Sequence, residues 1–119
     1  MIHSPTEEKD HLVSDYVAAA AQHRRATREG NSALANRSYD VLAGIYRALR
    51  EQGERERLLP LLADADPAVR GWAASHALEF APERAVPVLA ELAAGPPSSE
   101  RLDAQMTLKE WKKGTLKFP

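Results

Sequence analysis

One short segment of this chain returns 27 residues further on, and that internal repeat is the strongest constraint on the fold. The arginine, proline and aliphatic positions of residues 57–63 (RLLPLLA) recur in residues 84–90 (RAVPVLA). A return at a fixed period of this length is typical of stacked helix pairs that share one apolar core. The stretch 58–78 supplies such a pair, since Asp66-Pro67 separates two helical patterns. The repeat predicts an all-α protein that binds by surface shape, and it does not say what is bound.

Residues 54–114 resemble HEAT repeats, which combine leucines, an Asp-Pro step, a Val-Arg pair and small alanines. The residues that carry this resemblance are Leu58, Leu61, Leu62, Asp64, Asp66, Pro67, Val69, Arg70, Ala73, Ala74, Ala77 and Leu78. The stretches 82–89 and 104–114 are similar to a family of small bacterial HEAT-like proteins of unknown function. The resemblance implies a short right-handed α-solenoid of helical hairpins, and it carries over no catalytic residue.

Helix start and stop signals predict six helices in three pairs. The pairs cover about residues 6–52, 54–81 and 83–113 of a single domain, followed by a tail at 114–119. The expected N-caps are Thr6, Asn31, Asp66 and one of Ser98 or Ser99. Pro60 and Pro87 fall inside short helices at the same repeat position, which predicts a shared kink or a late helix start. Asp66 and Arg70 are expected to be structural, with Arg70 bonded to a neighbouring repeat.

Composition and charge limit the classes of function. Only 6% of the residues are aromatic and 44% are hydrophobic, so Leu, Val and Ala must build the core. The net charge is −1, with residues 24–57 at +3 and residues 58–98 at −3, which argues against a dedicated nucleic-acid surface. The chain has no cysteine, no leader pattern and no apolar run long enough to span a membrane. We therefore expect a cytoplasmic protein that does not contact membranes.

The fourth predicted helix carries the first candidate binding residues. A projection at about 100° per residue turns Val69 and the alanines toward the core. Trp72, Ser75 and Glu79 lie on the opposite arc, with His76 at its border. Because second helices line the concave face of a HEAT solenoid, this arc is expected to face a groove.

The second predicted helix extends this candidate surface. Its exposed residues are predicted to be Asn36, Arg37, Asp40, Arg47, Arg50 and Glu51. The predicted partner-binding wall consists of Trp72, Ser75, His76, Glu79, Asn36, Asp40 and Arg47. Two alternatives stay open: Trp72 either anchors a partner, as interface tryptophans often do, or packs sideways against another helix.

The sixth predicted helix is apolar on two sides. Leu102 and Met106 lie on one side, and Ala104, Leu108 and Trp111 lie on the other. Either the tail at 115–119 covers one side, which is the preferred interpretation, or that side is an exposed contact patch.

No catalytic or metal-binding pattern accompanies these residues. Among the four histidines only His11 has a helical partner, Asp15 at i+4, and two ligands do not hold zinc. Ser75 and His76 are adjacent on a helix and point apart, so they cannot form a nucleophile–base pair. We expect no enzyme activity, no cofactor and no metal.

Three functions follow as hypotheses. The first is a non-enzymatic protein-binding module, most concretely a small bacterial inhibitor or immunity protein that blocks a toxin or enzyme. The second is a nucleic-acid-binding protein related to the HEAT-like alkylpurine DNA glycosylases, in which Trp72 would hold a displaced base and Glu79 would supply a carboxylate within reach of it. The balanced charge and short length argue against it. The third is a scaffold subunit.

Overall fold

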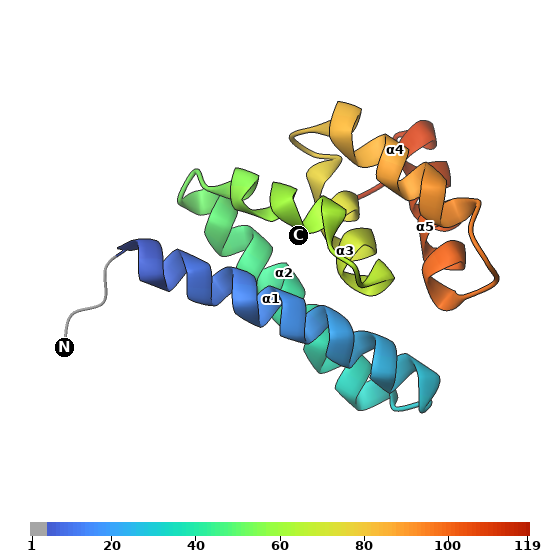
Figure 1. The fold of residues 1–119 in the computed structure, drawn as a ribbon, viewed down its shortest axis with the longest axis horizontal. Helices are drawn as coiled ribbons and strands as arrows, with labels where there is room; N and C mark the ends of the chain where they lie inside the picture. The colour runs from blue at the N-terminus through green and yellow to red at the C-terminus, as the bar shows by residue number, and fades with distance from the viewer. Residues whose placement is uncertain (1–4) are drawn as a thin grey trace. The chain divides into compact units, whose positions relative to one another are not determined.

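The structure, a computed structural model, describes the backbone of residues 5–119 and the side chains of residues 11–119. Within that range it contains five α-helices, one 3₁₀ helix and no β-strand (Figure 1). In chain order the elements are α1 (Pro5–Arg28), α2 (Ser32–Glu51), η1 (Arg55–Ala63), α3 (Pro67–Ala77), α4 (Pro82–Ala93) and α5 (Ser99–Lys113). The expected all-α class and its six helices are confirmed.

Packing divides the chain into two compact units, residues up to Arg57 and residues 58–118. The boundary falls inside η1, immediately before Leu58. The single-domain organisation expected from the sequence stays a prediction.

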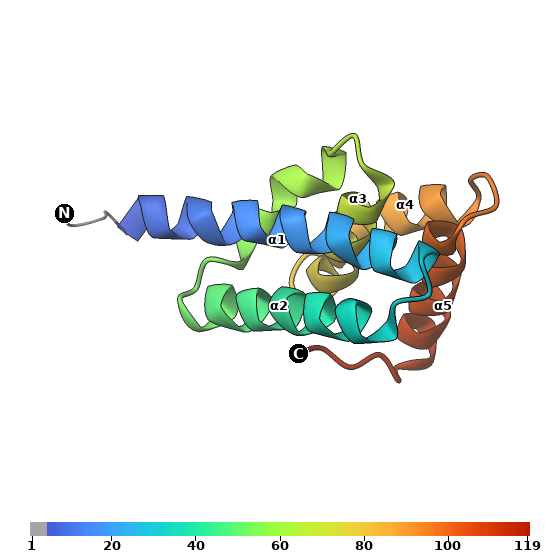
Figure 2. The same ribbon diagram turned by 90° about the horizontal axis from the view of Figure 1, so that it is seen from below.

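The first unit is an antiparallel hairpin of α1 and α2, which lie side by side (Figure 2). Gly30 takes a left-handed φ of 70° after α1, and the Asn31 side chain then caps α2 by accepting a hydrogen bond of 3.1 Å from the Leu34 N–H. Tyr16 of α1 and Tyr46 of α2 are both fully buried. Burial raises the pKa of Tyr16 well above 10, and the interaction with Tyr46 acts in the same direction. The Tyr16 side chain is therefore a neutral phenol within the core of this hairpin.

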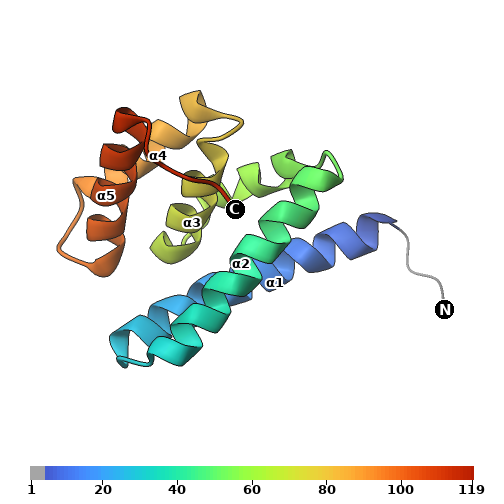
Figure 3. The same ribbon diagram turned by 180° about the vertical axis from the view of Figure 1, so that it is seen from behind.

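The second unit packs α3 against both α4 and α5, and α4 against α5 (Figure 3). The three α3 residues Ala73, Ala74 and Ala77 are fully buried, as the helical projection predicts. Side chains this small leave room for helices on more than one side of α3. Two bonds join α5 to the end of α4: Gln105 Nε2 donates to Ala93 O at 3.0 Å, and Arg101 Nη1 donates to Gly95 O at 3.4 Å.

The two prolines at the same repeat position lie in different kinds of helix. Pro60 is inside η1, which is a 3₁₀ helix rather than the expected α-helix, whereas Pro87 is inside the continuous α-helix α4. Because α4 begins at Pro82, it does not start late at Pro87. The late helix start expected at both prolines is therefore wrong, since η1 begins at Arg55 and α4 at Pro82, whereas the shared kink stays a prediction.

Most of the predicted helix ends are confirmed. Asp66 Oδ1 accepts a hydrogen bond of 2.9 Å from Ala68 N, and Ser98 Oγ accepts one of 3.0 Å from Arg101 N. Two ends differ from expectation. α1 already begins at Pro5, so Thr6 is not its cap, and α3 ends at Ala77 with residues 78–80 forming a turn.

Candidate functional site

The start of α3 is fixed by a set of bonds within one turn. Asp66 caps the helix, Pro67 occupies its first position, and Asp66 N donates to Asp64 Oδ1 at 2.8 Å. Arg70 Nη1 donates to Asp64 O at 2.7 Å and to Ala65 O at 3.2 Å. The structural role expected for Arg70 is confirmed, but these two bonds reach the turn before its own helix rather than a neighbouring repeat.

The α3 residues predicted to bind a partner differ in accessibility. Trp72 and Ser75 are half-buried and share one arc of the helix, as the projection predicts, and Glu79 is half-buried in the turn that follows α3. His76, by contrast, is buried, with only 5% of its surface exposed. The expectation that His76 borders an open surface is wrong. Because α3 packs against two helices of its unit, its buried arc is wider than a one-sided projection assumes.

The buried position of His76 changes its chemistry. Burial lowers the pKa of His76 from 6.5 to about 4, while the Glu79 carboxylate acts in the opposite direction. The imidazole is therefore neutral near pH 7. It lies next to Trp72, with ring centroids 6.1 Å apart. His76 supports the indole of Trp72 and does not itself present a surface to a partner.

The α2 residues of the predicted wall are exposed. Asn36, Asp40 and Arg47 all lie on the side of α2 opposite its buried residues. On that buried side the Ser38 hydroxyl lies 2.9 Å from Gln22 Oε1 of α1 and 2.9 Å from its own helix at Leu34 O. The contact with Gln22 joins α2 to α1. The α2 residues belong to the first unit and the α3 residues to the second, so the structure shows two sets of candidate residues.

The second unit also exposes an apolar pair on α5. Leu102 and Met106 are 60% and 61% exposed, whereas Ala104 is buried and Leu108 and Trp111 are half-buried. The preferred expectation that the tail covers one apolar side is therefore wrong for the side of Leu102 and Met106. The i, i+4 spacing opposite a buried alanine marked this patch in the sequence. Whether a tail covers such a patch depends on tertiary packing, which periodicity does not report.

The described residues hold no cluster suited to a metal. His11 Nε2 lies 3.2 Å from Asp15 Oδ2 on the exposed side of α1, and no group of three or more His, Cys, Asp or Glu side chains comes together in the described part of the chain. No helix among the described residues is both long and apolar enough to cross a bilayer.

Helices joined by capped turns, with alanine-lined contacts between them, define the class of helical repeat proteins. The model of the family described as HEAT repeats matches residues 31–109, which is more than half of the chain. The chain belongs to the HEAT-repeat family, whose members generally mediate protein interactions. It is similar to the crystal structure of the protein RPA1889 from Rhodopseudomonas palustris CGA009, with 26% identity, a TM-score of 0.84 and 93% of each chain covered. No curated protein matches this chain.

Proposed function

We propose that this protein is a non-enzymatic binding module whose partner is another protein. The observation that carries the proposal is the exposed pair Leu102 and Met106, two large apolar side chains one turn apart on α5. Single exposed apolar residues are common on any surface, but adjacent ones on one helix face form a contact patch. Lys109 and Lys113 continue the same face at i+7 and i+11 from Leu102. This α5 face (Leu102, Met106, Lys109 and Lys113) fits a partner groove with an apolar floor and an acidic rim.

Two further sets of residues are candidates for contact with a partner. In the second unit these are Trp72 and Ser75 of α3 and Glu79 of the turn after it, of which Trp72 offers the largest area. In the first unit the exposed α2 residues Asn36, Asp40 and Arg47 form a separate set. His76 acts only through its contact with Trp72, since its own surface is buried.

The most concrete form of this function is a small inhibitor or immunity protein that blocks a toxin or enzyme in the cytoplasm. Membership of a family that generally mediates protein interactions supports binding as the output. The absence of cysteine supports a reducing compartment. The step from binding to inhibition rests on analogy with other small repeat proteins.

The test first isolates proteins that bind the tagged chain by affinity capture. Each protein captured by the tagged chain is purified and titrated against wild type and the double variant Leu102→Ser/Met106→Ser. We expect the double variant to bind at least about tenfold more weakly, because both anchors of the contact are removed. If the partner is a toxin or enzyme, wild type should suppress its activity and the double variant should not.

The matched control is Tyr39→Ser, which removes an exposed apolar side chain (47% exposed) from α2 instead of α5. It should lower the affinity less than the double variant does, because it removes neither α5 anchor. The proposal fails if every purified partner binds the double variant as tightly as it binds wild type.

A further inference from the structure

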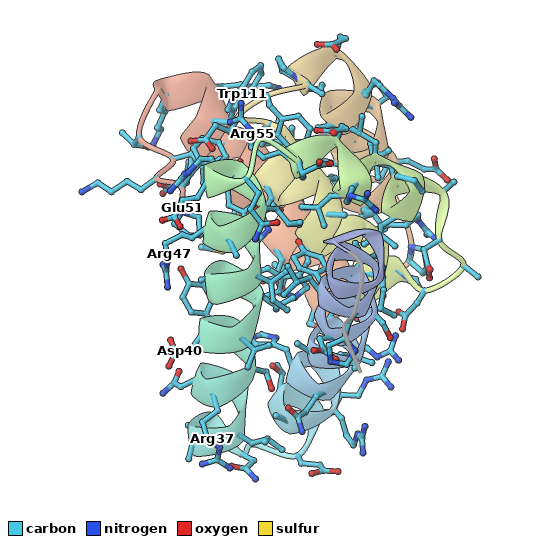
Figure 4. The ribbon with its side chains drawn as sticks, turned by 90° about the vertical axis from the view of Figure 1, so that its left-hand side faces the viewer. Arg37, Asp40, Arg47, Glu51, Arg55 and Trp111 are labelled. Atoms are coloured by element: carbon cyan, nitrogen blue, oxygen red, sulfur yellow. The ribbon has the colours of Figure 1, made fainter. Side chains whose placement is uncertain are left out.

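The outer face of α2 carries an ordered row of charges around one glycine. Arg37, Asp40, Gly44, Arg47 and Glu51 follow i, i+3, i+7, i+10 and i+14 spacing, which places them on one stripe of the helix. We call this stripe the outer α2 face. Figure 4 shows its four charged side chains on the side of the α2 ribbon that is turned away from α1. All four are exposed.

These four charges form no ion pair among the described residues. The spacings from Arg37 to Asp40 and from Arg47 to Glu51 allow pairs within the helix, but each has its cation on the N-terminal side, which is the weaker order. The remaining arginine of α2 is engaged elsewhere, because the Arg50 guanidinium lies 5.5 Å from the centre of the Tyr46 ring. The outer α2 face therefore presents two cations and two anions to an incoming surface.

Gly44 lies at the centre of this row. A Cβ added at Gly44 meets nothing within 4 Å, so no contact inside the chain requires glycine there. Glycine is also the least favourable residue after proline for the interior of a helix. A glycine in open space at mid-helix suits the close approach of another backbone from outside.

The order of the charges specifies what that other backbone is. Arg37 and Glu51 lie seven residues on either side of Gly44, and Asp40 and Arg47 lie four and three residues away. Reversing the helix about Gly44 therefore places Arg37 opposite Glu51 and Asp40 opposite Arg47, within about one residue rise of 1.5 Å. A parallel copy would instead oppose every charge to itself.

We propose that the outer α2 face binds the same face of a second copy of this chain, with the two α2 helices antiparallel and a two-fold axis beside Gly44. Such an interface is isologous, so each of the two distinct ion pairs occurs twice. The complementary charges set the orientation more than the strength, because exposed ion pairs are individually weak and screened by salt. Self-association is consequently weak and is favoured at low ionic strength.

This inference goes beyond the proposed function, because it assigns the outer α2 face, including the candidate residues Asp40 and Arg47, to self-association and leaves the α5 face for a different protein. The two are tested on separate residues. Loss of partner binding in the α5 variants does not affect the self-association measurement, and a monomeric chain does not affect the partner titration.

The experiment measures the sedimentation equilibrium of wild type and of two single variants, Arg37→Glu and Glu51→Arg. Each variant replaces two attractive contacts by two repulsive ones, so each should self-associate about tenfold more weakly or not at all. An equimolar mixture of the two variants restores both pairs, since Glu at position 37 of one chain meets Arg at position 51 of the other. The mixture should form heterodimers at least as readily as wild type forms dimers.

Salt and two further variants complete the design. Association of wild type should be measurable at ~10 mM salt and reduced at ~1 M salt, where the screening length falls from ~30 Å to ~3 Å. Gly44→Gln should abolish association while leaving the helix content intact, because the longer side chain blocks the helix crossing. Arg84→Glu on α4 makes the same change in net charge at an exposed residue outside the outer α2 face and should associate like wild type.

The proposal is overturned if wild type is monomeric at every concentration in low salt. It is also overturned if the mixed variants fail to associate, or if Gly44→Gln dimerises as wild type does. Circular dichroism on each variant establishes that a loss of association is not a loss of folding.

Discussion

The indole of Trp72 lies next to the imidazole of His76, with the ring centroids 6.1 Å apart and the ring planes tilted by 46°. The two residues are one helical turn apart on α3. His76 is buried while Trp72 is half-buried, so the buried imidazole supports the more accessible indole. Because the rings are in contact, substitutions at the two positions are not expected to be independent.

Acid should destabilise the protein through His76. Below pH 6.5 the unfolded chain binds a proton at this histidine that the folded chain accepts only near pH 4. The free energy of unfolding should therefore fall as the pH drops from 6.5 to about 4, by up to ~3 kcal/mol, and recover above pH 6.5. Urea unfolding at a series of pH values measures this slope. His76→Gln should flatten it between pH 5 and 6.5.

Replacement of Trp72 should affect binding and stability by different amounts. Trp72→Ala is expected to weaken partner binding by ~2 kcal/mol or more, because a large anchor is lost. Its cost in folding free energy should fall below the ~3–5 kcal/mol typical of a fully buried tryptophan, since the ring is only half-buried. Titration with the purified partner and urea unfolding are made on the same variant. A stability loss in the full range with unchanged affinity would identify Trp72 as a core residue only.

Gly44→Ala should stabilise the folded monomer. The new methyl group meets no atom within 4 Å, and alanine is favoured over glycine in a helix interior by ~0.5–1 kcal/mol. Thermal unfolding at a dilution where the chain is monomeric measures the gain. The contrasting variant is Gly30→Ala, which should be destabilising because Gly30 has a φ of 70°.

Ala77→Leu should overpack the second unit. Ala77 is fully buried on α3, so the added atoms have no room without movement of neighbouring helices. The expected loss is ~1–3 kcal/mol of folding free energy, measured by urea unfolding. Ala90→Leu on α4 adds the same atoms at an exposed position and should be nearly neutral. Equal midpoints for the two variants would show that the buried face of α3 is assigned wrongly.

Local signals in the sequence predicted the helix ends well. Asn31, Asp66 and one of Ser98 or Ser99 are predicted as caps because short polar side chains at a helix start accept from a backbone N–H two or three residues away, and the bonds of Asn31, Asp66 and Ser98 confirm this. The alanine face of α3 was predicted for a similar reason, since helical spacing fixes which residues share a side. Interactions that span only a few residues can therefore be predicted from the residue types and their spacing in the sequence.

Features that depend on packing were not predictable in this way. The burial of His76 depends on how many helices surround α3, and the exposure of Leu102 and Met106 depends on where the tail runs. The 3₁₀ geometry around Pro60 also departs from the α-helix that surrounds Pro87, although the two segments match in sequence. For the candidate site, periodicity therefore identified the residues of a face and left open how much of each is covered.

The bonds of Arg70 have a consequence for how such a chain changes length in evolution. Its guanidinium donates to Asp64 O and Ala65 O, which lie in the turn directly before α3. The capping bonds of Asp66 stay within the same few residues. A duplication of this segment would copy the turn together with all of these bonds, and a deletion would remove them together. Gain or loss of a repeat at this turn would thus leave none of these polar groups without its hydrogen-bond partner.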